Sequence, residues 1–383
     1  MTNLIEAIKR LFTPVTPLPP GIFHYQAPSD APVPYRLHLR LEPDGSGLLI
    51  VNASTVLHLN QTAAEFAYHL VQQTQEDQML REITSRYRVS QRQASQDFNA
   101  LQDRIQTLIH SPDLDPETFL DFERSTPHTH KISAPYRLDC ALTYRLSSTA
   151  DDSITPLKRV DRELSTQEWI GIFDKAWNFG IPHIILTGGE PTLRTDLPDL
   201  IAHTESNGQV VGLLSDGLRL ADPGYLQSLL QTGLDHLMLS LNPDDEISWN
   251  ALNNVLAADL FVTVHHTLTP KNVIGTAQVL ERLSKLGAKS ISLSASNPAL
   301  HASLAEFRNQ AASLGLSLVW DLPVPYSAYN PVALETQADN PASGAGHSWL
   351  YIEPDGDVLP GQGINQVLGN ILRDPWETLW HQN

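Results

Sequence analysis

HIILTGGEPTLR, residues 183–194, combines an apolar run of strand length with a sharp turn. Two glycines and Glu190 form that turn directly after the run. Upstream, LSTQEWIGIFDKAWNFG has the periodicity of an amphipathic helix, and Ser165 and Glu168 have the spacing of a capping box. A helix, a glycine and an apolar strand in this order predict one helix–strand unit of a parallel sheet.

The same order recurs through residues 135–326, at the junctions FGIPHIILTGG, TGLDHLMLSLN, LGAKSISLSAS and LGLSLVWDLPV. The glycines that would end the helices in a left-handed conformation are Gly180, Gly233, Gly287 and Gly315. We count six or seven strands, too few for an eight-unit barrel, which takes about 250 residues. No G-x-G-x-x-G follows any strand, so a doubly wound sheet is disfavoured and a partial barrel is predicted.

The flanking regions predict separate parts. Residues 1–34 predict an amphipathic helix, which could dock on the protein itself, a partner or a membrane surface, and a proline-rich linker. Residues 35–110 predict three strands, then three helices, the first with Asn60 as its N-cap. A linker is expected at residues 111–134, and a hairpin with a short helix at residues 327–383.

Composition excludes several classes of protein. The formal charge is −18, with 43 acidic and 25 basic residues, which disfavours non-specific nucleic-acid binding. No apolar run approaches the ~18 residues of a membrane span, and no signal-peptide pattern opens the chain. The lone Cys140 excludes an intramolecular disulfide and a four-thiolate metal site, and its apolar surroundings predict a buried side chain. We therefore expect a soluble cytoplasmic protein.

The order of TYR, ELST, TGGEPTLR, LLSDG and LSLN resembles that of radical S-adenosylmethionine (SAM) enzymes. The resemblance implies an α/β chain with a partial (β/α)6 barrel. It also implies an N-terminal winged-helix-like α+β domain similar to the peptide-recognition domain PqqD, and a truncated tail similar to the auxiliary-cluster (SPASM) domain. The remnant SAM site that it implies consists of Gly188, Gly189, Glu190, Ser240 and Asn242.

The sequence departs from that family at its metal ligands. The family carries three cysteines spaced C-x3-C-x2-C after the first strand, and these positions are Leu146, Ala150 and Ser153 here. Gly361 stands where the tail pattern has another cysteine, and Asp216 replaces an asparagine usual after the third strand. From this loss we predict no metal site, no [4Fe–4S] cluster and no resident cofactor, with SAM binding a minor alternative.

Our leading functional hypothesis is a catalytically inactive pseudoenzyme that binds a peptide or protein, as an accessory to peptide modification. Its partner could be an active radical SAM paralogue. By resemblance to PqqD, the peptide would add as a strand beside the third predicted strand and against the last helix of that unit. The residues of that strand are Val56, Leu57, His58 and Leu59.

Two alternatives stay open. The first is an enzyme with cluster-independent chemistry in the barrel mouth, with candidate groups Glu190, Asp216, His265, His266 and Asp321. The two histidines are adjacent on a predicted strand and point to opposite faces, so only one of them can line the barrel. The second alternative is a structural subunit of a larger assembly.

Overall fold

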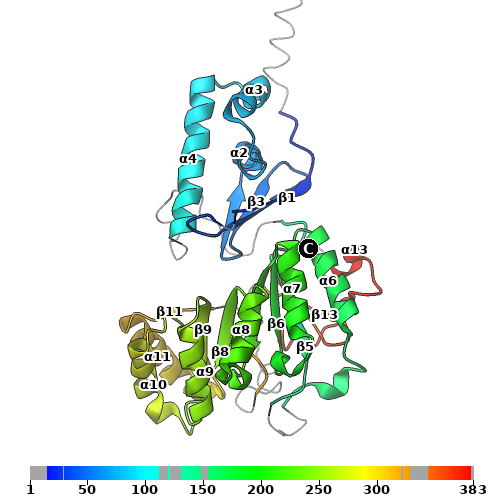
Figure 1. Cartoon of the computed structure of the whole chain (residues 1–383). Coiled ribbons are helices and arrows are strands. Elements are labelled where there is room, and N and C mark those ends of the chain that lie inside the picture. Colours follow the sequence, from blue (N-terminus) through cyan, green and yellow to red (C-terminus); the bar gives the residue numbers. More distant parts are fainter. Residues whose placement is uncertain are drawn as a thin grey trace, which may run out of the picture. The chain divides into compact units, whose positions relative to one another are not determined.

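The computed structural model describes residues 15–28, 30–111, 120, 131–147, 154–320, 322–327 and 344–380 of the 383-residue chain. Two compact units divide the chain: unit 1, residues 1–126, and unit 2, residues 127–383 (Figure 1). The helix predicted near the N-terminus lies outside the described residues. Within the described ranges, no helix is long and apolar enough to cross a membrane.

Unit 1 is an antiparallel sheet with the strand order β1-β2-β3-β4, followed by three helices. Its strands are β1 (Gly21–Gln26), β2 (Arg36–Leu41), β3 (Gly47–Val51) and β4 (Thr55–Leu59). Its helices are α2 (Gln61–Val71), α3 (Glu76–Arg86) and α4 (Gln91–His110). The predicted linker thus contains a strand, β1. Its residues are almost all half-buried, so the segment lacks the alternation that reveals a strand.

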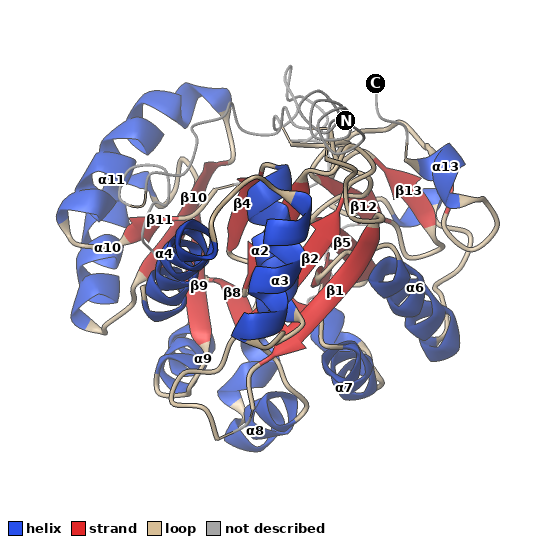
Figure 2. Cartoon of the chain, turned by 90° about the horizontal axis from the view of Figure 1, so that it is seen from above, coloured by secondary structure: helices blue, strands red, loops and turns tan. Residues whose placement is uncertain are grey.

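The core of unit 1 follows the period of two in its central strands. Leu37, Leu39 and Leu49 are buried among apolar side chains of the helices, together with Leu57 of β4. Asn60 caps α2 as predicted, because its side chain accepts a hydrogen bond from a backbone N–H in the first turn. Helix α4 lies on the β4 side of α2, and β1 lies on the other side (Figure 2).

Unit 2 contains a ten-stranded sheet with the order β11-β10-β9-β8-β7-β6-β5-β12-β13-β14. Strands β5 to β11 are parallel to one another, and the chain returns between them through helices. The strands are β5 (Arg137–Thr143), β6 (His183–Gly188), β7 (Val210–Ser215), β8 (His236–Ser240), β9 (Phe261–Leu268), β10 (Ser290–Ala295) and β11 (Ser317–Leu318). The helices are α6 (Thr166–Asn178), α7 (Leu197–Asn207), α8 (Pro223–Gln231), α9 (Glu246–Leu256), α10 (Thr276–Lys285) and α11 (His301–Ser313).

The predicted partial barrel is confirmed. The helices α6 to α11 form an arc outside the strands (Figure 2), and within the described residues the sheet is open, with β11 and β14 at its two ends. Local signals explain the repeats: the capping box of Ser165 and Glu168 starts α6. The four predicted glycines have φ of 73°, 92°, 86° and 75°, where residues with a side chain are strained.

The C-terminal segment belongs to this sheet, a role that a hairpin prediction does not include. Strand β12 (Trp349–Ile352) pairs in parallel with β5, and β13 (Asp357–Leu359) and β14 (Gly369–Asn370) extend the sheet. Helix α13 (Trp376–Leu379) packs on the end of α6, where the Trp376 and Phe179 rings stack with centroids 4.5 Å apart. Lys175 Nζ also donates to the Ile371 carbonyl at 2.8 Å.

Candidate functional site

The two glycines after β6 allow the backbone to approach the end of β5. Gly189 N donates to Thr143 O at 2.8 Å, and Glu190 N donates to Arg145 O at 2.8 Å. A Cβ atom on Gly188 would lie 2.2 Å from Thr143 O, and one on Gly189 would lie 2.2 Å from Arg145 O. The chain's own backbone therefore requires these glycines, whether or not a ligand is bound.

The carboxylate of Glu190 is buried and fully engaged with the chain. Its Oε1 accepts hydrogen bonds from the Thr192 N–H at 2.9 Å, the Thr192 hydroxyl at 2.5 Å and the Ser215 hydroxyl at 2.9 Å. Its Oε2 accepts from Asp216 N at 2.7 Å. Burial, and then the neighbouring Asp216 carboxylate, raise the pKa of Glu190 to about 8. Glu190 thus joins the ends of β6 and β7.

This raised pKa gives a pH dependence with a definite sign. The folded pKa is about 8 and the ordinary value is 4.5, so the folded state binds more protons between these pH values. The free energy of unfolding should therefore fall as pH rises through this window, by up to about 1.4 kcal/mol per pH unit from Glu190. Urea unfolding from pH 5 to 8 measures the slope. Glu190→Gln cannot titrate and should show a shallower slope, and equal slopes would contradict this role.

Polar side chains at the ends of β6, β7 and β8 line the barrel interior. Thr187 is fully buried, and its hydroxyl has no hydrogen-bond partner among the described residues. Asp216, Ser240 and Asn242 are half-buried. Asn242 Oδ1 accepts from Asp244 N at 3.2 Å. The structure therefore brings the predicted Ser240 and Asn242 to the same rim as Asp216 and the two glycines.

The two adjacent histidines of β9 point to opposite faces, as predicted. His266 lies 3.3 Å from the Thr276 hydroxyl of α10, outside the barrel. His265 lies inside and contacts three hydroxyls at 3.0–3.1 Å, those of Ser292, Thr267 and Ser294. Burial lowers its pKa to about 3, so this imidazole is neutral and a weak base.

Sequence reasoning missed the three hydroxyls around His265. Thr267 lies two residues from His265 on the same strand, whereas the signal for Ser292 and Ser294 was the register of β9 and β10, in which His265 is paired with Ser292. This register connects two segments far apart in the chain, so no local pattern shows it. Asp321, the other candidate of the alternative enzyme, lies outside the described residues.

The positions of the absent cysteines are apolar or lie outside the described residues. Leu146 is half-buried and packs in a cluster inside the barrel whose buried members are Ala141, Tyr144, Tyr326, Tyr351 and Leu359. Gly361 is buried, and a Cβ there would lie 3.1 Å from the Ala345 side chain. Cys140 is fully buried in the core between sheet and helices, as predicted. Ala150 and Ser153 lie outside the described residues.

The predicted peptide-binding strand, β4, is an edge of the sheet in the described part of unit 1. Asn52 N donates to Arg36 O of β2, so alternate residues of β3 point toward β2 and the others toward β4. In this register the backbone groups of Thr55, Leu57 and Leu59 pair with β3. Those of Val56 and His58 therefore point to the outer edge, while the Leu57 and Leu59 side chains are buried in the core.

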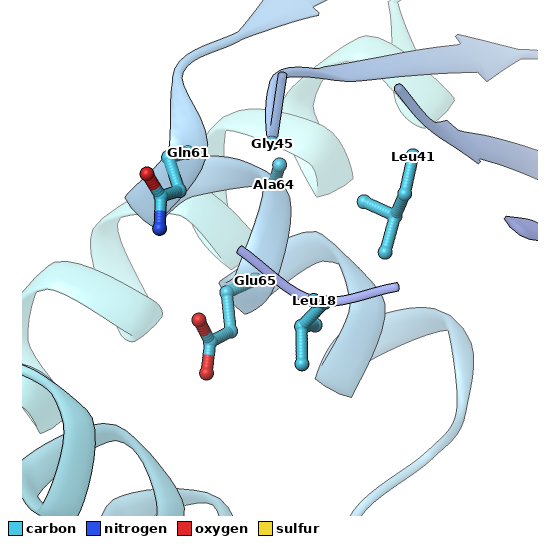
Figure 3. A pocket seen from close by; sticks show the side chains of 6 residues that line it. All are labelled: Leu18, Leu41, Gly45, Gln61, Ala64 and Glu65. Atoms are coloured by element: carbon cyan, nitrogen blue, oxygen red, sulfur yellow. The ribbon is translucent and has the colours of Figure 1, made fainter. Parts of the chain in front are cut away.

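Unit 1 also contains a small pocket, shown in Figure 3, whose enclosed volume is about 0 Å³. It is lined by Leu18, Leu41, Gly45, Gln61, Ala64 and Glu65. The Glu65 carboxylate is already bound by Arg86 Nε at 2.6 Å and by the Tyr87 hydroxyl at 2.9 Å. Pockets for small molecules usually exceed about 300 Å³, so this pocket is too small for such a ligand.

A sequence profile of the Radical SAM superfamily matches residues 140–255, which run from β5 into α9. The chain thus contains a radical SAM domain over residues 140–255. Among radical SAM relatives, the PqqA peptide cyclase of Streptomyces rochei is 27% identical over 281 residues, covering 65% of this chain and 76% of that protein. The PqqA peptide cyclase of Rhizobium meliloti is 35% identical over 113 residues, 29% of this chain and 30% of that protein.

The radical SAM fold is also seen in solved structures of SuiB from Streptococcus suis. SuiB is 14% identical and matches with a TM-score of 0.58, over 91% of this chain and 87% of SuiB. SuiB has also been solved with its precursor peptide SuiA, with a TM-score of 0.56, and with SAM, with a TM-score of 0.55. At this identity the likeness concerns the fold.

These comparisons correct one prediction. No resident cofactor and no [4Fe–4S] cluster were expected, but the radical SAM superfamily is defined by SAM and SuiB binds it. SAM and a [4Fe–4S] cluster are the cofactors that the match to this superfamily implies. The prediction argued from absent cysteines to an absent cofactor. That step was wrong because SAM is an organic molecule, and groups other than thiolates can recognise it.

The residues at the rim fit SAM. The buried hydroxyl of Thr187, which has no partner among the residues that the structure describes, could bind a ligand, and Asp216 can hold an ammonium group. Ser240 and Asn242 can bind ribose hydroxyls beside it. When bound, SAM would supply a sulfonium centre with transferable groups.

The described residues do not offer the set of thiolates that a cluster prefers. The only cysteine, Cys140, lies on the helix-facing side of β5, and Leu146 has no ligand atom in its side chain. The function proposed below therefore includes no step through a cluster.

Proposed function

We propose that this chain binds an extended peptide along the outer edge of β4 and serves peptide modification as a recognition partner, without radical chemistry of its own. The observation that carries the proposal is the register of β4, which directs the backbone groups of Val56 and His58 away from β3. An added strand gains main-chain hydrogen bonds at such an edge, and alternate side chains supply specificity.

The comparisons support the peptide class of the ligand. Relatives of this chain are PqqA peptide cyclases, and SuiB has been solved with a precursor peptide. In this proposal residues 35–110 act as a PqqD-like recognition domain, and α4, on the β4 side of that unit (Figure 2), flanks the peptide. The proposed partner is a radical SAM enzyme that has its metal ligands.

The proposal of a non-catalytic role rests on side-chain chemistry. Leu146 packs among tyrosines where the family pattern has its first cysteine. The next two positions, Ala150 and Ser153, hold a methyl group and a hydroxyl. Within the described residues, the hydrogen-bond partners of the neutral His265 side chain are hydroxyl groups, without the carboxylate that orients a catalytic base.

A proline at the edge tests the peptide site. Val56→Pro deletes an outward N–H, which an edge strand tolerates, and should weaken peptide binding about tenfold while unit 1 stays folded. The measurement is fluorescence anisotropy with labelled precursor peptides, beginning with PqqA and SuiA, and circular dichroism checks the fold. Val56→Ala keeps the N–H and should bind like the wild type.

Leu57→Pro supplies the opposite control. Its N–H pairs with β3, so this proline should unfold unit 1 instead of affecting binding alone. Unchanged affinity in a folded Val56→Pro variant would contradict the proposed edge. Mass spectrometry of the bound peptide, with SAM and reductant present, separates recognition from catalysis. A peptide modified by this chain alone would exclude the non-catalytic role.

A further inference from the structure

Residues 322–326, here called the strap, lie in the interior of the barrel. Leu322 packs against Ile185, Leu214 and Met238, which come from the three neighbouring strands β6, β7 and β8. These three side chains form a cluster of their own, separate from the core between the sheet and its helices. The strap therefore covers an apolar patch inside the barrel.

The strap is held through its backbone. Gln362 Oε1 accepts from Val324 N at 2.9 Å, and Gln362 Nε2 donates to Val324 O at 2.7 Å. Two residues further on, Tyr326 N donates to Gly188 O at 2.9 Å. The Gln362 side chain and the Gly188 carbonyl thus make hydrogen bonds to the backbone of the strap. A neighbouring strand makes the same kind of hydrogen bonds to a strand added to a β-sheet.

The sequence of the strap, LPVPY, suits this role. Pro323 and Pro325 have no N–H to satisfy and keep the backbone extended. The remaining donors fall on alternate residues, and those of Val324 and Tyr326 are the two that are bound. The contacts of the strap therefore repeat every second residue. Leu322 contributes an apolar side chain, the backbone of Val324 makes two hydrogen bonds to one amide side chain, and Tyr326 donates its N–H.

We propose that the seat of the strap, formed by Ile185, Leu214, Met238, Gln362 and the Gly188 carbonyl, is a second peptide-binding site. Its ligand is an extended peptide segment whose first residue has an apolar side chain. The third residue must offer its backbone N–H and C=O groups, and the fifth residue its backbone N–H. The strap occupies this site as an internal competitor. The site lies in unit 2 and does not depend on the proposed edge of β4.

Because the strap belongs to the same chain, it would occupy this site whenever no other peptide displaces it. A tethered segment has an effective concentration in the millimolar range, so a free peptide of similar affinity loses the competition. The strap also binds Gly188, one of the residues predicted for the SAM site. Its release would therefore open the apolar patch and free a carbonyl at the rim in one step.

The three methionines of the chain provide a direct test. Met238 lies in the seat, whereas Met79 is fully buried in unit 1 and serves as an internal reference. With methyl-¹³C methionine, Leu322→Ala should shift the Met238 signal and leave Met79 unchanged. Addition of the peptide LPVPY should then return Met238 toward its wild-type position. The wild type should bind this peptide at least about tenfold more weakly than the variant.

Matched variants separate the seat from general loosening. Gln362→Ala removes both bonds to Val324 and should raise hydrogen exchange at Val324 and Tyr326 about tenfold, whereas Gln366→Ala, exposed in the same segment, should not. The Leu322→Ala/Gln362→Ala double variant lacks the amide of the seat and should not bind the peptide LPVPY. The peptide DPVPY, which has aspartate in place of the leucine, should not bind the Leu322→Ala variant. Equal binding by wild type and Leu322→Ala, an unmoved Met238 signal, or binding by the double variant would each overturn the proposal.

Discussion

Gly189→Ala should lower the free energy of unfolding of unit 2 by at least about 4 kcal/mol. The new Cβ would lie 2.2 Å from Arg145 O and 2.9 Å from the carbonyl carbon of Tyr144. Both atoms are backbone, so they cannot move without breaking the bonds that join the ends of β5 and β6. Urea unfolding followed by tryptophan fluorescence measures the loss. All seven tryptophans lie in residues 127–383, so the signal reports on unit 2 alone.

Gly171→Ala is the matched control for this substitution. Gly171 lies inside α6, and a Cβ there meets nothing within 4 Å. Alanine is the better helix former, so this variant should gain up to about 1 kcal/mol. A Gly189→Ala variant as stable as the wild type would show that the motif is not required for packing and would return its glycines to a purely ligand-binding role.

The second large effect concerns Arg194, at the end of the same motif. Its side chain is 8% exposed, and its guanidinium pairs with Asp196 at 2.9 and 2.7 Å and donates to Leu142 O and Leu164 O. Arg194→Met keeps the length of the side chain but leaves the half-buried Asp196 carboxylate and two carbonyls without this donor. The expected loss is about 3–5 kcal/mol in the same unfolding experiment.

An exposed arginine provides the comparison. Arg162 pairs with Glu168 at 2.5 Å, with side chains 55% and 30% exposed. Water and salt screen such a pair, so Arg162→Met should change stability little. If the two methionine variants lost the same stability, burial of Arg194 would not be the cause of its effect.

The parts of the fold that follow from local chemistry could be predicted from the sequence. Helix ends were found because a cap needs a particular residue at a particular spacing, as at Asn60 and Ser165. The βα order was found because β6, β8, β10 and β11 each follow a helix and a glycine. Strand β1 was missed because an edge strand with half-buried residues carries no apolar alternation.

The site was only partly predictable, for a related reason. The rim glycines and the opposite faces of His265 and His266 follow from motif and strand period. The bonds of Glu190 to β7, the hydroxyls around His265 and the strap depend on which distant segments meet. The cofactor prediction failed because it treated one missing ligand type as the loss of all binding chemistry.

The pairing of β12 with β5 has a consequence for biosynthesis. β5 receives β6 as a neighbour soon after both leave the ribosome, but its other neighbour is encoded roughly 200 residues later. At about 5–20 residues per second, that delay lasts about 10–40 s. Throughout this time one edge of β5 presents unpaired amide and carbonyl groups, a template for wrong partners. Unit 2 therefore completes its sheet only after β12 to β14 have been synthesised, and its nascent form before that point is the stage at which a chaperone protects the most exposed backbone.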